Sequence, residues 1–217
     1  PTIDWDYHDY RDSDIERYIP AALEMVRRGN HAVRLGAIVE RPLLASGNGI
    51  IDYATKNRTD FMDIYLSAKC RFLLCDGAGI ASVATVFRRP VAFVNIVPME
   101  VVCTWNPKSI FIPKKIWNSR ESRYLSFSEI LNSGVGRFLR SEQYQALDLK
   151  AIENTPQEIA DVTLELDDRL NGAWESSEDD DELQRRFWSL FKPSELNGVF
   201  LGRIGAKFLR QNRELLG

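Results

Sequence analysis

Hydrophobic and polar positions along the first 60 residues alternate between helical and strand-like spacing. Over residues 13–29 the apolar side chains recur every three or four positions, which predicts an amphipathic helix with Ser13 as a candidate N-cap. Pro20 falls inside this pattern, so the helix either kinks there or begins again at that residue. Two short apolar runs, at residues 31–36 and 50–53, predict strands on either side of a glycine-bearing loop.

The stretch from residue 59 to residue 97 has the clearest pattern. It predicts, in order, a helix capped by Thr59 and apolar over most of its surface, a strand at 71–75, a glycine turn at 76–79, a helix at 80–87 and a strand at 91–97. Because a helix that is apolar all round is a buried one, we expect the helix after Thr59 to lie between the sheet and other elements. Strands that are apolar on both faces and alternate with helices indicate a parallel sheet and an α/β fold.

The second half of the chain is expected to be mainly helical. The pattern predicts a strand at 109–113, a capped helix starting near residue 125, a helix at 155–170 with Pro156 in its first turn, a solvated acidic run at 178–182 leading into a further helix, and a last helix at 199–215. We therefore expect a Rossmann-like parallel sheet flanked by helices in residues 1–150, and a C-terminal helical extension in residues 151–217 packed on it as a single structural unit.

Composition and charge narrow the class of protein. The chain has 217 residues, of which 44% are hydrophobic and 27% charged, as in a folded globular domain. The longest apolar runs are strand-sized, far below the roughly 18 residues of a membrane span. Residues 152–182 hold twelve acidic residues and one basic residue, so the remainder carries +8 within a total of −3. A mildly basic body suits an anionic ligand or a membrane surface, although ordinary solvated lysines and arginines explain it too.

The three cysteines are an odd number and lack metal-ligand spacing. We interpret Cys70, Cys75 and Cys103 as reduced core thiols of a cytoplasmic protein. The pI near 5.6 and the absence of a dense basic and aromatic stripe exclude nucleic acid as a partner.

The glycine turn after the strand at 71–75 is the strongest chemical signal. The strand is followed by a turn with Gly77 and Gly79, and a helix begins directly after it. Such a turn exposes backbone N–H groups, and the helix dipole adds positive potential, so phosphate is a candidate ligand. The alternative is an ordinary tight turn. The third glycine of the dinucleotide fingerprint is missing, which disfavours a nicotinamide dehydrogenase.

Ordered blocks along nearly the whole chain resemble a family of bacterial glycosyltransferases. These blocks are Tyr10-Arg11-Asp12-Ser13-Asp14, Val33-Arg34-Leu35-Gly36, Ile51-Asp52-Tyr53-Ala54, the run from Thr59 to Leu66, Arg88-Arg89-Pro90 with Val94-Asn95, Ile112-Pro113-Lys114-Lys115, the stretch from Leu125 to Ile130, and the run from Arg203 to Arg210. More distantly, the Asp63 to Ser82 region is similar to the donor-binding half of fucosyltransferases of the GT-B architecture, in which two Rossmann-like domains face each other across a cleft.

The resemblance implies a set of donor-binding residues. The diphosphate of a nucleotide sugar would lie on the turn and helix start formed by Asp76, Gly77, Ala78, Gly79, Ile80, Ala81 and Ser82. Arg11 and Arg34 are candidate diphosphate partners because a guanidinium binds phosphate bidentately, with surface ion pairs as the alternative. Gly36, Asp52 and Tyr53 would contact the nucleotide, although Tyr53 could equally be a core aromatic residue. Asp63 would orient the loop through its amides or be a plain exposed helix acid.

The chain departs from the family in ways that affect catalysis. The family's acceptor-binding domain and an Arg-Asp-Ser element before the Tyr10 region are absent, so no catalytic base is assigned. An acidic cluster near the start of the chain could mimic a general base or a metal site: Asp4, Asp6, Asp9, Asp12 and Asp14. We interpret it as a solvated loop, and we expect no metal and no cofactor.

The function expected from the resemblance is metal-independent transfer of a sugar from a nucleotide diphosphate to a glycan or lipid-linked acceptor. A non-catalytic nucleotide-sugar or phosphate-binding module that acts with a partner subunit is the alternative, and a purely structural α/β domain is a second one. The expected location is cytoplasmic, and peripheral membrane contact would use the basic face of the last helix, unless that helix packs on the core.

Overall fold

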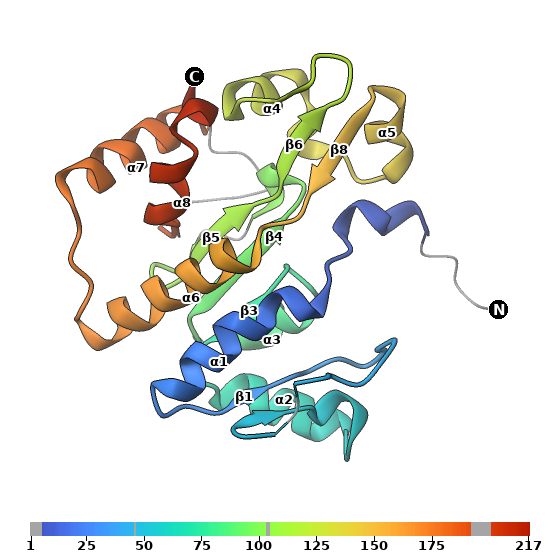
Figure 1. The fold of residues 1–217 in the computed structure, drawn as a ribbon, viewed down its shortest axis with the longest axis vertical. Coiled ribbons are helices and arrows are strands. Elements are labelled where there is room, and N and C mark those ends of the chain that lie inside the picture. The colour runs from blue at the N-terminus through green and yellow to red at the C-terminus, as the bar shows by residue number, and fades with distance from the viewer. Residues whose placement is uncertain (1–5, 46, 103–104, 192–200) are drawn as a thin grey trace.

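A four-stranded parallel sheet forms the centre of the fold (Figure 1). The structure is a computed structural model that describes residues 6–45, 47–102, 105–191 and 201–217. The strand order is β3-β4-β5-β9, and every neighbouring pair is parallel. The strands span Leu73–Cys75, Val91–Ile96, Ile110–Pro113 and Arg203–Ile204. The predicted α/β class with a Rossmann-like parallel sheet is confirmed.

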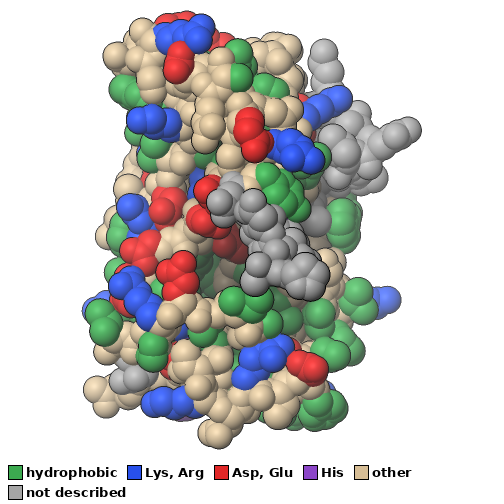
Figure 2. All heavy atoms as spheres, turned by 90° about the vertical axis from the view of Figure 1, so that its right-hand side faces the viewer, with side chains coloured by type: hydrophobic (Ala, Val, Ile, Leu, Met, Phe, Trp, Pro, Cys, Tyr) green, Lys and Arg blue, Asp and Glu red, His purple; other side chains and the backbone are tan. Residues whose placement is uncertain are grey.

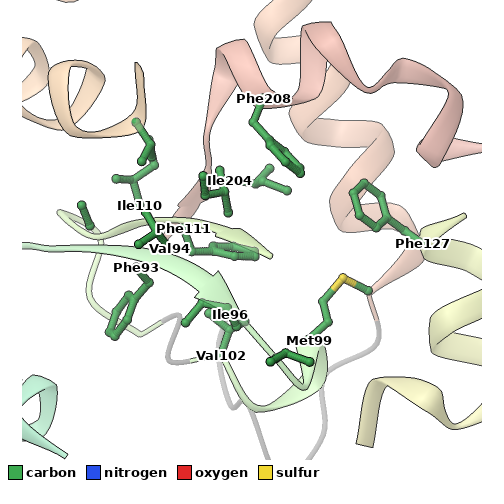
Figure 3. Packing of buried hydrophobic residues seen from close by; sticks show 14 of the residues in the cluster. Phe93, Val94, Ile96, Met99, Val102, Ile110, Phe111, Phe127, Ile204 and Phe208 are labelled. Carbon is green, nitrogen blue, oxygen red and sulfur yellow. The ribbon is translucent and has the colours of Figure 1, made fainter. Parts of the chain in front are cut away.

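The core lies on both faces of this sheet. All six residues of β4 are buried, and so are all four residues of β5, which is why these strands are apolar without alternation. Figure 3 shows Phe93 and Phe208 on opposite sides of the sheet, with Phe208 contributed by a C-terminal helix. Phe111 packs edge-on against Phe187 at 5.8 Å between ring centroids, which ties the sheet to the helix that carries Phe187.

Helices cover the sheet in two groups. Helices α1 (Ile19–Arg27) and α6 (Pro156–Asn171) pack against each other and pass in front of the sheet in Figure 1. Helix α3 (Ile80–Val86) connects β3 to β4 and packs against α2 (Asp60–Lys69). Helices α7 (Glu178–Leu190) and α8 (Ala206–Gln211) pack against each other.

Two smaller sheets complete the described chain. Strands β1 (Ala32–Val33) and β2 (Ile50–Ile51) form a short parallel pair. An antiparallel sheet of order β7-β6-β8, which the sequence pattern did not predict, is built from Arg123–Tyr124, Lys115–Asn118 and Leu149–Ile152. Because β6 begins just after β5 ends, Lys114 sits where the chain leaves the parallel sheet for the antiparallel one.

The remaining elements are short helices at the edges of these sheets. Two α-helices follow β7, at Phe127–Ser133 (α4) and Ser141–Ala146 (α5). Short 3-10 helices lie at Asp6–Arg11, Ile15–Tyr18, Tyr53–Thr55, Met99–Val101, Val135–Arg137 and Arg213–Leu216.

Several predicted helix starts are confirmed. Thr59 caps α2 by accepting a hydrogen bond from Met62 N at 3.2 Å. Thr155 forms a capping box with Glu158, and Pro156 occupies the first turn of α6. Pro20 lies in the first turn of α1, so of the two alternatives the helix begins again there, after a separate 3-10 turn. In each case the residue satisfies or removes a backbone donor that a helix start leaves unpaired.

The prediction that the helix after Thr59 is packed on all sides is wrong. Phe61, Ile64 and Tyr65 are exposed, with Phe61 at 71%, although Phe61 and Tyr65 stack on each other at 6.0 Å. Helix α2 buries only its other side, against α3 and neighbouring residues, and Ser67 is its one buried residue. Apolar composition did not distinguish the two sides of this helix.

The prediction of one last helix over 199–215 is also wrong. Residues 199 and 200 lie outside the described residues, residues 203–204 form strand β9, and only then does α8 begin. The basic side chains of residues 207–213 do not form a free face, because each pairs with an acid of α6 or α7: Lys207 with Asp161, Arg210 with Asp180, and Arg213, just after α8, with Asp179. Because β9 pairs with β5, residues 151–217 contribute a strand to the central sheet of residues 1–150. No described helix is both long and apolar enough to cross a bilayer.

The acidic run at 178–182 is helical and not a loop, although four of its five residues are exposed as predicted. It forms the first turn of α7, and Asp180 within it is fully buried. Asp180 accepts a hydrogen bond from Ser177 N at 3.0 Å and pairs with Arg210. Burial on its own raises the pKa of Asp180, but the Ser177 N–H and the Arg210 guanidinium outweigh it and hold that pKa below its ordinary value.

We predict that Asp180→Ala destabilises the fold by about 3 kcal/mol, because it removes a helix cap and leaves Arg210 without its buried carboxylate. Since the folded-state pKa of Asp180 is lowered, this contribution is present above the pKa of an unfolded aspartate and is lost as pH falls through the folded-state value. Urea unfolding at neutral and acid pH measures both effects. The control is Asp181→Ala, whose side chain is 70% exposed; an equal loss there would contradict the prediction.

Candidate functional site

The carboxyl edge of the central sheet gathers polar side chains from several segments. Asp76 follows β3, Asn95 lies near the end of β4, and Lys114 follows β5. Segment 6–14 contacts the ends of β3 and β5 through its own side chains and carbonyl groups. Tyr18 contacts the end of β4, just before α1 begins. In open parallel sheets this edge is where ligands bind, so it is the candidate site.

A reciprocal asparagine pair fixes the middle of the edge. Asn95 N donates to Asn154 Oδ1 at 2.6 Å, and Asn154 N donates to Asn95 Oδ1 at 2.6 Å. Asn154 Nδ2 also donates to Pro113 O at 2.9 Å, at the end of β5. Both asparagines are buried, and Asn95 has a φ of 54°, where the register of β4 with β5 shifts. Six buried polar groups are thus satisfied at a point where the sheet ladder is interrupted.

A line of hydrogen bonds runs from this pair to the end of β3. Asn95 Nδ2 donates to the Tyr18 hydroxyl at 3.2 Å, which lies 3.2 Å from Ser13 Oγ, and Ser13 Oγ donates to Asp76 Oδ2 at 2.9 Å. Because the single Ser13 proton goes to Asp76, the Tyr18 hydroxyl is the donor to Ser13. Burial raises the pKa of Tyr18, and the Asp76 charge adds to the effect, which keeps this hydroxyl protonated.

Lys114 is a buried cation at the end of β5. Its side-chain nitrogen donates to Tyr10 O at 3.0 Å and to Asp12 O at 2.5 Å, the carbonyls on either side of Arg11. The residue is only 4% exposed. Burial lowers the pKa of Lys114, against the raising effect of Glu153, Asp76 and Asp12. The bonds to neutral carbonyls hold the ammonium in place, and no carboxylate of the described residues lies at contact distance to neutralise its charge.

The glycine turn lies beside this cluster and is open to solvent. Ala78 and Gly79 are exposed, and Gly77 has a φ of +81°, which favours glycine. Arg11 Nη2 donates to Gly77 O at 3.3 Å, so one predicted arginine does lie against the turn. The N–H groups of Ala81 and Ser82 donate to Ala78 O and Gly79 O within the turn. With α3 only seven residues long, a ligand here would depend more on Arg11 than on the helix dipole.

Of the other predicted residues, Arg34, Gly36, Asp52 and Tyr53 lie around the small β1-β2 sheet. Arg34 and Asp52 form a buried pair at 3.5 Å. Asp52 also accepts from Leu43 N at 2.9 Å and from Thr55 Oγ1 at 2.7 Å. Although burial raises the pKa of Asp52, these hydrogen bonds and Arg34 lower it overall. The described contacts of this pair are to its own loops.

Tyr53 and Asp63 likewise make contacts within their own segment. Tyr53 is buried, and its hydroxyl donates to Thr59 O at 2.9 Å and accepts from Thr59 N at 2.8 Å, as a core aromatic residue at the start of α2. Asp63 accepts from Arg58 at 2.6 Å. Ile80 and Ala81 continue into α3, with Ala81 buried and Ser82 exposed.

The acidic cluster and the cysteines add little to the site. Asp4 and the Asp6 side chain lie outside the described residues, and Asp9, Asp12 and Asp14 are exposed. No three histidine, cysteine or acidic side chains in the described ranges could hold a metal together. Cys70 and Cys75 carry reduced thiols, half-buried and buried respectively, and Cys103 is not among the described residues.

Sequence reasoning missed four residues of the cluster: Tyr18, Asn95, Lys114 and Asn154. Asn95 did leave a signal, because it is the one polar residue in the run 91–97. Lys114 follows a buried strand directly, as a phosphate-binding lysine would. Tyr18 fits the apolar spacing of the helix pattern over residues 13–29, which hides the role of its hydroxyl. Asn154 has no local pattern that sets it apart.

The face that carries the N-terminal segment has a mixed surface. In Figure 2 acidic and basic side chains lie interspersed over this face, without one dominant sign of charge. An anionic ligand at the sheet edge would therefore be attracted by the few cations next to it rather than by the field of the whole face.

Comparison of the chain with known proteins found no match, whether to a protein-family model, to a curated protein or to a solved structure. The described fold and the contacts at the sheet edge are therefore the basis for a functional proposal.

We predict that the stability of the wild-type chain rises relative to Lys114→Met as pH increases from 7 to 10. Because the folded-state pKa of Lys114 is lowered, there is a pH window in which the unfolded chain still holds a proton that the folded chain has released. Stability rises with pH across that window and lacks this contribution below it. Urea midpoints at the two pH values measure the change. Lys150→Met, which removes an exposed lysine of β8, is the control, and an equal pH effect in both variants would contradict the prediction.

Proposed function

We propose that this chain binds a nucleotide-diphosphate sugar at the carboxyl edge of its parallel sheet, as the donor-binding half of a glycosyltransferase of GT-B architecture. The observation that carries the proposal is the contact of Arg11 with the exposed glycine turn, next to the buried ammonium of Lys114. The resemblance of the sequence blocks to bacterial glycosyltransferases supplies the substrate class.

The two cations have different roles in this proposal. Arg11 is half-buried beside the turn, and its N–H groups that make no hydrogen bond within the described residues can reach the diphosphate oxygens bidentately. Lys114 lies beneath residues 10–12 and acts at longer range, where the surrounding low dielectric strengthens its field. Together they would stabilise the negative charge that develops on the departing nucleoside diphosphate, without a metal ion.

The acceptor side of the reaction is proposed to lie outside this chain. Transfer to a glycan or lipid-linked acceptor needs a general base close to the acceptor hydroxyl, and we assign no described residue to that role. An acceptor-binding domain facing the sheet edge would supply the base. In the non-catalytic alternative, the same edge holds the nucleotide sugar for a partner subunit.

We expect Gly79→Leu to abolish binding of the matching nucleoside diphosphate while the fold stays intact. A Cβ at Gly79 meets nothing within 4 Å, and its φ of −53° suits any residue, so only a ligand on the turn would clash with the new side chain. Arg11→Gln should weaken binding about tenfold, as expected for the loss of a charged hydrogen bond.

Calorimetric titration with uridine, guanosine, cytidine and thymidine diphosphates measures these effects. The control is Arg120→Gln, an arginine with a 65% exposed side chain that pairs with Asp148. Wild-type affinity in Gly79→Leu, or no binding of any of the four nucleotides to the wild type, would contradict the proposed site. If binding holds, release of nucleoside diphosphate from a sugar donor in the presence of an acceptor domain separates the transferase from the binding module.

A further inference from the structure

A cavity lies at the opposite, amino-terminal edge of the central sheet. It has a volume of about 480 Å³, within the usual range for small-molecule sites. Its lining comes from the start of β5, the last turns of α6, the 172–176 loop and β9. The proposed nucleotide site does not use any of these residues, so the two sites can be tested separately.

The cavity has three basic side chains around it. Arg169 is held by the buried Glu165, with Nε 2.9 Å from Glu165 Oε1. Glu165 in turn accepts a hydrogen bond from Ala206 N at 2.7 Å, which fixes the carboxylate in its ion pair with Arg169. Lys108 is exposed at the cavity edge.

Arg203 is the least satisfied of these cations. Its Nε is buried and has no hydrogen-bond partner in the described part of the chain. Its Nη2 reaches Asp181 at 3.4 Å, a carboxylate that is 70% exposed. The backbone of Arg203 is fixed by a bond from its N–H to Ser109 O at 3.2 Å, so β9 holds the guanidinium at the cavity. Three cations against the carboxylates of Glu165 and Asp181 leave the cavity positive.

Beside Ser109 and Ser176, the rest of the side-chain lining is apolar or aromatic. Ile110 and Leu166 are almost fully buried, and they contribute an apolar wall together with Leu170. Trp174 lies at the cavity with the Arg169 guanidinium 4.7 Å from its ring centre. A ring bound here would pack on apolar carbon, and its anionic group would meet the cations.

We propose that this cavity binds a small organic anion, a phosphate or carboxylate attached to a planar ring, with Lys108 and Arg203 contacting the anionic group. Trp174 and the apolar wall contact the ring. The site is independent of the nucleotide site at the other edge of the sheet.

Phenyl phosphate is the probe, with inorganic phosphate, benzoate and phenol as comparison ligands in calorimetric titrations of the full chain. We expect phenyl phosphate to bind saturably and more tightly than phosphate or phenol alone. If benzoate binds as tightly as phenyl phosphate, the site accepts either a carboxylate or a phosphate. If benzoate binds more weakly, the site prefers a phosphate. Lys108→Gln and Arg203→Gln should each weaken phenyl phosphate binding about tenfold, as the loss of one charged contact implies.

The control is Lys56→Gln, which removes the same charge from another exposed lysine and should leave the affinity unchanged. Lys108 is exposed, so its variant tests the site even if Arg203→Gln does not fold. Gly79→Leu should bind phenyl phosphate like the wild type. Absence of saturable binding, equal weakening in Lys56→Gln, or equal affinity for inorganic phosphate and phenyl phosphate would overturn the proposal.

Discussion

The hydrogen-bonded pair of Asn95 and Asn154 holds the functional edge of this protein together. A parallel sheet ends in unpaired backbone groups, and here the two asparagines satisfy each other's N–H groups while Asn154 also satisfies a carbonyl of β5. From Asn95 the bonds continue through Tyr18 and Ser13 to Asp76 at the end of β3. Three strand ends and the N-terminal segment are thus fixed by one hydrogen-bond network, which is buried at the asparagine pair and part-buried between Tyr18 and Asp76.

This network determines how open the edge is. Because Ser13 is anchored to Asp76, residues 10–12 are held over the end of β5, where their carbonyls hold Lys114. Arg11 is consequently placed against the glycine turn at the surface, and Lys114 stays below it. A ligand at this edge would meet the guanidinium directly and the ammonium only through its field. The difference in burial therefore makes Arg11 a contact residue, whereas Lys114 acts on the ligand only through its electrostatic field.

The sequence predicted the elements that local chemistry determines. The parallel strands at 91–96 and 110–113, the cap at Thr59, the helix start at Pro156 and the glycine turn all follow from patterns within a few residues. Strand β9 and the antiparallel sheet were missed because two-residue and four-residue strands form through partners far along the chain. The site followed the same rule: Arg11 and the turn have local signals, whereas Asn154 gains its role only through Asn95, 59 residues away.

Charge shows most clearly why linear patterns mislead in this protein. The acidic stretch of α6 and α7 and the basic residues elsewhere look like separate surfaces in the sequence, yet the fold pairs them. Asp167 alone binds both Arg28 and Arg71, and Glu158 binds Lys115 at 2.9 Å. The basic side chains outside residues 152–182 are therefore largely held in ion pairs within the fold. What is left for an anion comes from cations that have no carboxylate partner at contact distance among the described residues, such as Lys114 at one edge of the sheet, or only an exposed one, such as Arg203 at the other.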